Sequence, residues 1–150
     1  MHTTPYISGQ TPSSKRLIKI AGVFFMVLGV GHLIVVTVVR RDVMGAWVAD
    51  GIFSVVPLGA TGAPAEMLQS AVAFWAGPAS FAVPLFLLGY LFWHLAGIGV
   101  RIPRVVGWVL VGWLIVSSVI LSPSPFYLGI AAAVLVVIAG REKVATRAGR

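Results

Sequence analysis

The stretch that decides the fold is residues 17–39, LIKIAGVFFMVLGVGHLIVVTVV. A helix rises about 1.5 Å per residue and the hydrocarbon core of a bilayer is roughly 30 Å thick, so these 23 residues are long enough to cross a membrane. The stretch exceeds the roughly 7–15 apolar residues of a signal-peptide core, and no small-residue cleavage motif closes it. We therefore predict an uncleaved membrane-spanning helix.

Three further apolar runs, at residues 71–93, 105–121 and 126–140, have the same character. Of all residues 59% are hydrophobic and 10% charged, and the mean hydropathy is +1.00. A soluble domain normally carries about 25% charged residues, so this composition excludes one. The sequence predicts an all-α fold: an integral membrane four-helix bundle in one membrane domain, residues 17–140.

The basic residues predict the orientation of this bundle. Four spans place nine of the eleven Lys and Arg residues on the side of both termini, and only Arg40 and Arg41 on the other side. Because basic loops remain in the cytoplasm, we expect both termini to be cytoplasmic. Residues 1–16 then form a polar, disordered lead and residues 141–150 a basic tail. The net charge of +7 indicates contact with anionic lipid head groups, and we expect no nucleic-acid partner.

The loop after the first span contains a second helical pattern. Met44, Trp47, Val48, Ile52 and Val55 recur at helical spacing. This spacing predicts a short amphipathic helix in the membrane interface, with Trp47 at head-group depth.

Two prolines interrupt the second predicted span. Pro78 and Pro84 each remove a backbone donor, which predicts a kink or a locally opened turn. Within a membrane such a break is tolerated only where other groups satisfy the freed carbonyls.

His32 is the strongest candidate for a functional side chain. It lies inside the first span on the same helical face as Gly29, and small residues mark the side that another helix approaches. Ser80 and either Ser117 or Ser118 lie at a similar predicted depth, with Glu66 and Trp75 near the outer boundary. The predicted ligand-binding residues are therefore His32, Ser80, Ser117, Glu66 and Trp75. The alternative is a neutral His32 that donates one hydrogen bond to a serine or to a carbonyl freed by a proline.

Several chemistries have no residues to support them. The chain has no Cys, and its four carboxylates form no cluster with metal-ligand spacing. No phosphate loop, dinucleotide fingerprint, H-E-x-x-H motif or nucleophile elbow occurs. We therefore predict no metal, no cofactor and no catalytic residue.

A succession of short motifs resembles a known family: small four-span bacterial integral membrane proteins catalogued as a domain of unknown function. The motifs are Gly29-Val30-Gly31-His32, Ala73-Phe74-Trp75 with Gly77, the run from Gly89 to Trp93, Arg101-Ile102-Pro103 ahead of Gly107-Trp108, and Pro123-Ser124-Pro125-Phe126-Tyr127. Family members more often carry Gly where this chain has Pro125. The resemblance covers about residues 17–140 and implies the fold and a bacterial inner-membrane location, but no activity.

Two functions remain open. The absence of catalytic constellations favours a non-enzymatic accessory or structural membrane protein that packs against a protein partner or a second copy. The alternative is a small-molecule or lipid-binding membrane protein, a transporter or an enzyme, with its site in the outer half of the bundle around His32.

Overall fold

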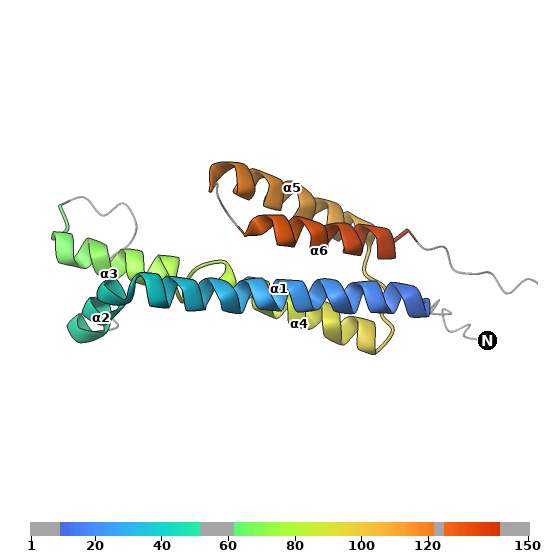
Figure 1. The fold of residues 1–150 in the computed structure, drawn as a ribbon, viewed down its shortest axis with the longest axis horizontal. Coiled ribbons are helices and arrows are strands. Elements are labelled where there is room, and N and C mark those ends of the chain that lie inside the picture. Colours follow the sequence, from blue (N-terminus) through green and yellow to red (C-terminus); the bar gives the residue numbers. More distant parts are fainter. Residues whose placement is uncertain (1–9, 52–61, 122–124, 142–150) are drawn as a thin grey trace, which may run out of the picture. The chain divides into compact units, whose positions relative to one another are not determined.

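The structure is a computed structural model that describes residues 10–51, 62–121 and 125–141. Over these residues the chain forms six α-helices and no strand (Figure 1), which confirms the all-α prediction. The helices are α1 (Pro12–Val39), α2 (Arg41–Asp50), α3 (Ala65–Ala76), α4 (Ala82–Gly97), α5 (Arg104–Ile120) and α6 (Phe126–Ala139). Most of the predicted lead, the turn containing Pro123 and the predicted tail from residue 142 lie outside the described residues.

The chain divides into two compact units. The terminal unit comprises Met1–Met26 and Leu88–Arg150, and the central unit comprises Val27–Leu87. The first part of α1 and the last part of α4 belong to the terminal unit, and the rest of both helices belongs to the central unit.

One described helix, α1, is long and apolar enough to cross a membrane, judged by length and composition. The helices α4, α5 and α6 are also apolar but shorter, with 16, 17 and 14 residues. The four-span arrangement therefore stays a prediction, although α5 and α6 begin and end within one residue of the predicted spans.

α1 begins at Pro12, five residues before the predicted span. The Thr11 hydroxyl accepts a hydrogen bond from the Ser14 N–H at 3.2 Å, and Pro12 occupies the first helical position. A threonine cap followed by proline is a favoured helix start, because the cap satisfies an N–H that has no partner in the helix. The last residues of the predicted lead are therefore helical.

In the terminal unit, α1 and α4 approach each other at two glycines. A Cβ atom built on Gly22 would lie 2.6 Å from the Gly89 carbonyl oxygen, and one built on Gly89 would lie 2.5 Å from the Gly22 carbonyl oxygen. Only residues without a side chain permit this backbone contact. Phe25 and Phe92 pack edge to face beside it, with ring centroids 5.9 Å apart.

The same unit contains α5 and α6, which lie side by side (Figure 1). Gly107 on α5 faces α6 so closely that a Cβ atom there would lie 2.8 Å from the Val137 backbone nitrogen. Leu114 and Val136 are fully buried. Contacts at small residues therefore hold this unit together.

In the central unit, α2 packs against α3. The Trp47 and Phe74 rings meet edge to face at 6.0 Å, and the Met44 side chain lies against Gly77. The predicted short helix is thus present as α2, while Ile52 and Val55 lie outside the described residues. Its position in a membrane interface stays a prediction.

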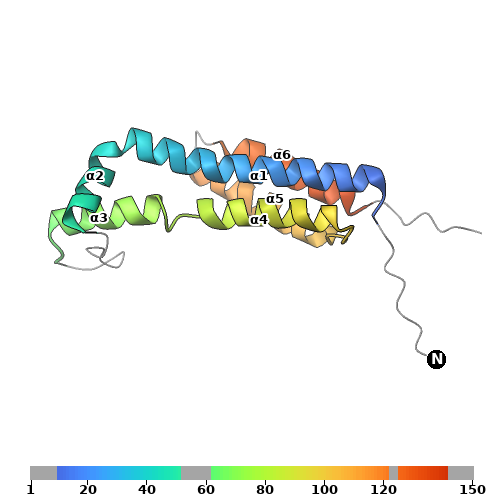
Figure 2. The ribbon, with the colours of Figure 1, turned by 90° about the horizontal axis from the view of Figure 1, so that it is seen from below.

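The second predicted span is divided. Helix α3 ends at Ala76 and α4 begins at Ala82, with an uncoiled segment between them (Figure 2). Pro78 lies in this segment and lacks the N–H that would continue the helix. The prediction of a kink or an opened turn is correct at Pro78, where the change is large enough to separate two helices. Pro84 lies in the first turn of α4, where a missing N–H interrupts no helix.

Candidate functional site

The uncoiled segment between α3 and α4 frees one backbone carbonyl. In a continued helix the Ser80 N–H would donate to the Ala76 carbonyl, but here it donates to the Gly77 carbonyl at 3.1 Å. The Ala79 N–H donates to the Phe74 carbonyl at 2.9 Å. The carbonyl of Ala76, at the end of α3, therefore needs a donor from elsewhere.

His32 supplies that donor. Its Nε2 atom lies 3.1 Å from the Ala76 carbonyl oxygen. Because a carbonyl oxygen only accepts, Nε2 carries the hydrogen and donates it. The ring also lies against Phe81, with centroids 4.8 Å apart and an interplanar angle of 48°. His32 is half-buried. It contacts both sides of the break, at Ala76 and at Phe81.

Gly29 explains why His32 reaches the break. A Cβ atom built on Gly29 would lie 2.5 Å from the Ala82 carbonyl oxygen and 3.0 Å from the Phe86 backbone nitrogen. α1 therefore contacts the backbone of α4 at the start of that helix. His32 follows three residues later on the same face of α1, where the uncoiled segment lies.

Ser80 also serves the backbone. Its Oγ atom accepts a hydrogen bond from the Ala82 N–H at 3.2 Å, at the start of α4. Such a bond satisfies one of the N–H groups that a helix start leaves without a partner. The Ser80 hydroxyl and the His32 imidazole thus stabilise the α4 and α3 sides of the break respectively.

The other predicted site residues each have surroundings of their own. Glu66 lies exposed in the first turn of α3, ten residues or roughly 15 Å along the helix from Ala76. Trp75 is 42% exposed and packs on Phe74. Ser117 belongs to the terminal unit, where its hydroxyl donates to the Trp113 carbonyl of its own helix at 2.8 Å. A ligand-binding role for these residues stays a prediction.

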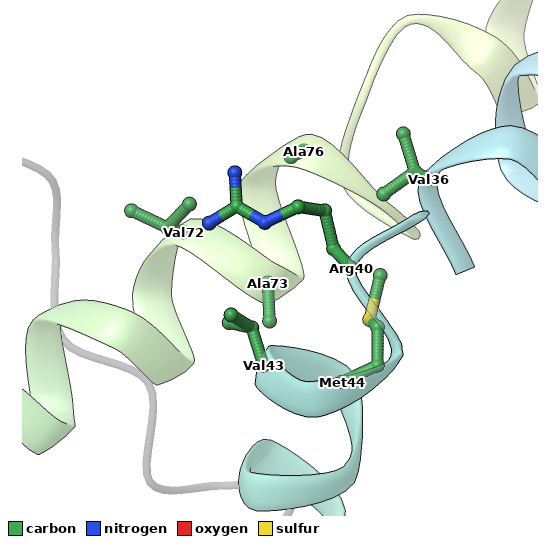
Figure 3. A pocket seen from close by; sticks show the side chains of 7 residues that line it. All are labelled: Val36, Arg40, Val43, Met44, Val72, Ala73 and Ala76. Atoms are coloured by element: carbon green, nitrogen blue, oxygen red, sulfur yellow. The ribbon is translucent and has the colours of Figure 1, made fainter. Parts of the chain in front are cut away.

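A small hollow of about 20 Å³, partly open to the surroundings, lies beside Ala76. In Figure 3 the Arg40 side chain extends from the end of α1 toward α3. The lining side chains other than Arg40 are apolar: Val36, Val43, Met44, Val72, Ala73 and Ala76. Sequence reasoning missed this hollow, because its lining comes from three helices and only Arg40 is distinctive.

The searched residues, those the structure describes, contain no group of three His, Cys, Asp or Glu side chains that could hold a metal ion. The site's chemistry is therefore hydrogen bonding to a freed carbonyl, next to an apolar hollow with one arginine.

Comparison with known proteins gives a family and no activity. Residues 16–143 match the family of unknown function DUF6463, and the chain belongs to this family. No curated protein and no solved structure matches the chain.

Proposed function

We propose that this member of a family of unknown function is a four-span, non-enzymatic protein of a bacterial inner membrane that packs an exposed helix face against a protein partner or a second copy. The spans would be α1, α3 with α4, α5 and α6. Both termini would be cytoplasmic, since the basic residues cluster on their side.

Exposed apolar side chains support the membrane location. Soluble monomers rarely expose contiguous apolar patches larger than a few hundred Å². Here large apolar residues are exposed along most of α1 and α5, with exposed fractions of 59% at Val27 and 76% at Val119. In lipid these side chains need no protein cover. The break between α3 and α4 is compatible with lipid because His32 satisfies the Ala76 carbonyl.

The observation that carries the packing role is Gly112 on α5. A glycine inside a helix costs about 1 kcal/mol relative to alanine. At Gly107, on the same helix, the close contact with α6 offsets the cost of that glycine. At Gly112 no such contact exists, because no neighbour lies within 4 Å of a Cβ atom built there. The surrounding face is apolar and exposed: Trp108, Val109, Ile115, Val116 and Val119. In membranes such a small residue on an apolar face permits close approach of another helix.

Cysteine crosslinking tests this role directly, since the chain has no native Cys. Val116→Cys places a thiol on the Gly112 face of α5, and Ile138→Cys places one on an exposed position of α6 as a matched control. In native membranes we expect Val116→Cys to give one discrete crosslinked band with itself or one partner, and Ile138→Cys to give none. Adding Gly112→Leu should remove the band without loss of expression. Absence of any band from Val116→Cys, or an equal band from Ile138→Cys, would contradict the packing role.

The hollow beside Ala76 supports a second candidate, binding of a small molecule or lipid in the central unit. Arg40 would pair with an anionic group, and the apolar lining would contact the carbon atoms next to that group. His32 holds one wall through Ala76. This candidate predicts that Arg40→Gln abolishes a cellular phenotype at unchanged thermal stability. A normal phenotype in a stably expressed Arg40→Gln variant would contradict it.

A further inference from the structure

Helix α5 carries two stripes of residues on nearly opposite sides. The first stripe is buried, and Gly107 within it contacts α6; its members are Gly107, Val111, Leu114 and Ser118. The second stripe is exposed, and we name it the valine seam: Val105, Val109, Gly112, Val116 and Val119. Each stripe follows the alternating three- and four-residue spacing of one helix face. At about 100° per residue, the directions of the two stripes differ by roughly 150°.

The valine seam differs in composition from the surface beside it. Its four valines are between 57% and 76% exposed. Larger exposed side chains flank it on both sides: Trp108 and Ile115 on one, Trp113 and Ile120 on the other. Valine has one dominant rotamer in a helix, so its side chain loses little entropy when another helix packs on it. The seam is therefore preorganised for contact with a second helix.

Gly112 lies at the centre of the valine seam, and it differs from the other glycines of α5 and α6. Gly107 and Gly129 are buried. Nothing lies within 4 Å of a Cβ atom built on Gly112, so an alanine would fit there and would favour the helix. A glycine at this position lets a backbone approach closely from outside the chain, as Gly107 does for α6.

The distribution of charge on α5 limits which partner suits the seam. Arg104, the one charged residue of the helix, lies against the end of α6, with its Cβ 2.6 Å from the Cβ position of Gly140. The two serine hydroxyls of α5 donate to carbonyls of the same helix, four residues earlier. The seam itself contains only valine and glycine, so a charged or polar group on a partner would find no counterpart there. The matching surface is uncharged and apolar.

A second copy of α5 meets this requirement. Copies inserted into a membrane with the same orientation pair about a two-fold axis along the membrane normal, and each seam residue then faces its own counterpart. Gly112 is the middle residue of the 17 in α5, so two helices that cross there make contact on both sides of the crossing. In such a pair valines meet valines, the two glycines meet at the closest approach, and both Arg104 side chains stay on the α6 side.

We propose that two copies of this chain associate through their valine seams, with parallel α5 helices that cross at Gly112. This inference rests on the proposed function, because it identifies the partner against which the exposed face of α5 packs. Van der Waals contact and close backbone approach hold the pair together, and both drive the association of helices in lipid.

Energy transfer between donor-labelled and acceptor-labelled copies in liposomes tests the proposal. The full chain carries its label on an amino-terminal tag, and transfer is followed as the protein-to-lipid ratio falls. Gly112→Leu inserts a side chain from each copy at the crossing and should require about ten-fold more protein for half-maximal transfer. Gly97→Leu is the matched control, since Gly97 is an exposed glycine of α4 with nothing within 4 Å of its Cβ position. It should pair as the natural chain does.

Cysteine crosslinking in the same liposomes tests the direction of the pair. Val109→Cys should form a disulfide with its own counterpart and give a band at twice 15.9 kDa. Ile138→Cys is the control, because Ile138 is exposed on α6 and follows Val137, the residue that contacts Gly107. It lies at a similar level along α5 but away from the seam, and should give no band.

The outcomes separate the alternatives. Equal transfer in Gly112→Leu and the natural chain, or no transfer beyond random proximity, would overturn the pair. Equal bands from Val109→Cys and Ile138→Cys would overturn the valine seam as its interface. The proposed function fails separately. If Val116→Cys in native membranes crosslinks only to a different protein, the packing role stands and the second copy is overturned; if it gives no band in membranes or liposomes, both are overturned.

Discussion

α1 meets α4 twice, once in each unit, and the two contacts differ in their chemistry. In the terminal unit Gly22 and Gly89 bring two uninterrupted helical segments into backbone contact. In the central unit Gly29 makes a similar approach, but α4 begins there, next to the uncoiled segment. A continuous helix satisfies its own carbonyls, so the first contact needs only small residues. The second requires a hydrogen-bond donor, and His32 provides it.

The largest expected effect comes from disturbing the terminal-unit contact. Gly89→Ala places a methyl group 2.5 Å from the Gly22 carbonyl oxygen, which forces the two backbones apart. We expect a loss of about 1–3 kcal/mol in unfolding free energy, the usual cost of overpacking. Tryptophan fluorescence during thermal unfolding in detergent measures it. Gly97→Ala on the same helix is the control, because nothing lies within 4 Å of its Cβ position. Equal melting of the two variants would show that the glycine contact is not essential.

An intermediate effect is expected from His32 in the central unit. His32→Ala leaves the Ala76 carbonyl without its donor. If α1 and α3 lie in a membrane as proposed, the expected cost is about 0.6 kcal/mol, the average for a hydrogen bond between membrane helices, and at most about 1.7 kcal/mol. His32→Gln retains an N–H donor and should recover part of that loss. His94→Ala in the terminal unit is a matched control, since His94 is exposed and stacks on Tyr90. If His32→Gln and His32→Ala melt together, the hydrogen bond is not what stabilises the break.

The smallest expected effect is at the start of α4. Ser80→Ala removes the acceptor for the Ala82 N–H and should cost about 0.5–1 kcal/mol. Ser117→Ala should cost less, because the Ser117 hydroxyl donates to a carbonyl within an uninterrupted helix. Hydrogen exchange at the start of α4 provides a local readout. Faster exchange at the start of α4 in Ser117→Ala than in Ser80→Ala would contradict the claim that the Ser80 hydroxyl stabilises this helix start.

The sequence predicts the uninterrupted helices well. α5 and α6 are continuous apolar runs that begin after Pro103 and Pro125, so length and proline position define their bounds. The start of α1 was missed because Thr11 and Pro12 lie in a polar segment whose composition hides a helix cap.

The candidate site was predictable only in part. A neutral His32 that bonds a freed carbonyl was one of two alternatives, and the structure contains such a bond. Ala76 could not be identified, because every residue carries a carbonyl and the one left free depends on where the helix opens. Phe81 was missed because its ring contact with His32 also depends on where the helix opens. Glu66 was predicted near the outer boundary and was included in the site with His32, but it lies in the first turn of α3, ten residues before the end of that helix.

The hydrogen bond between Ser14 and the Ala139 carbonyl has a consequence for biosynthesis. Its two residues are 125 positions apart in the chain. At about 5–20 residues per second, a ribosome needs roughly 6–25 s to make the intervening chain. The Ser14 hydroxyl therefore cannot form this hydrogen bond until α6 has been synthesised. A nascent chain stalled before α6 should expose the Ser14 region to a protease, and completion of α6 should protect it.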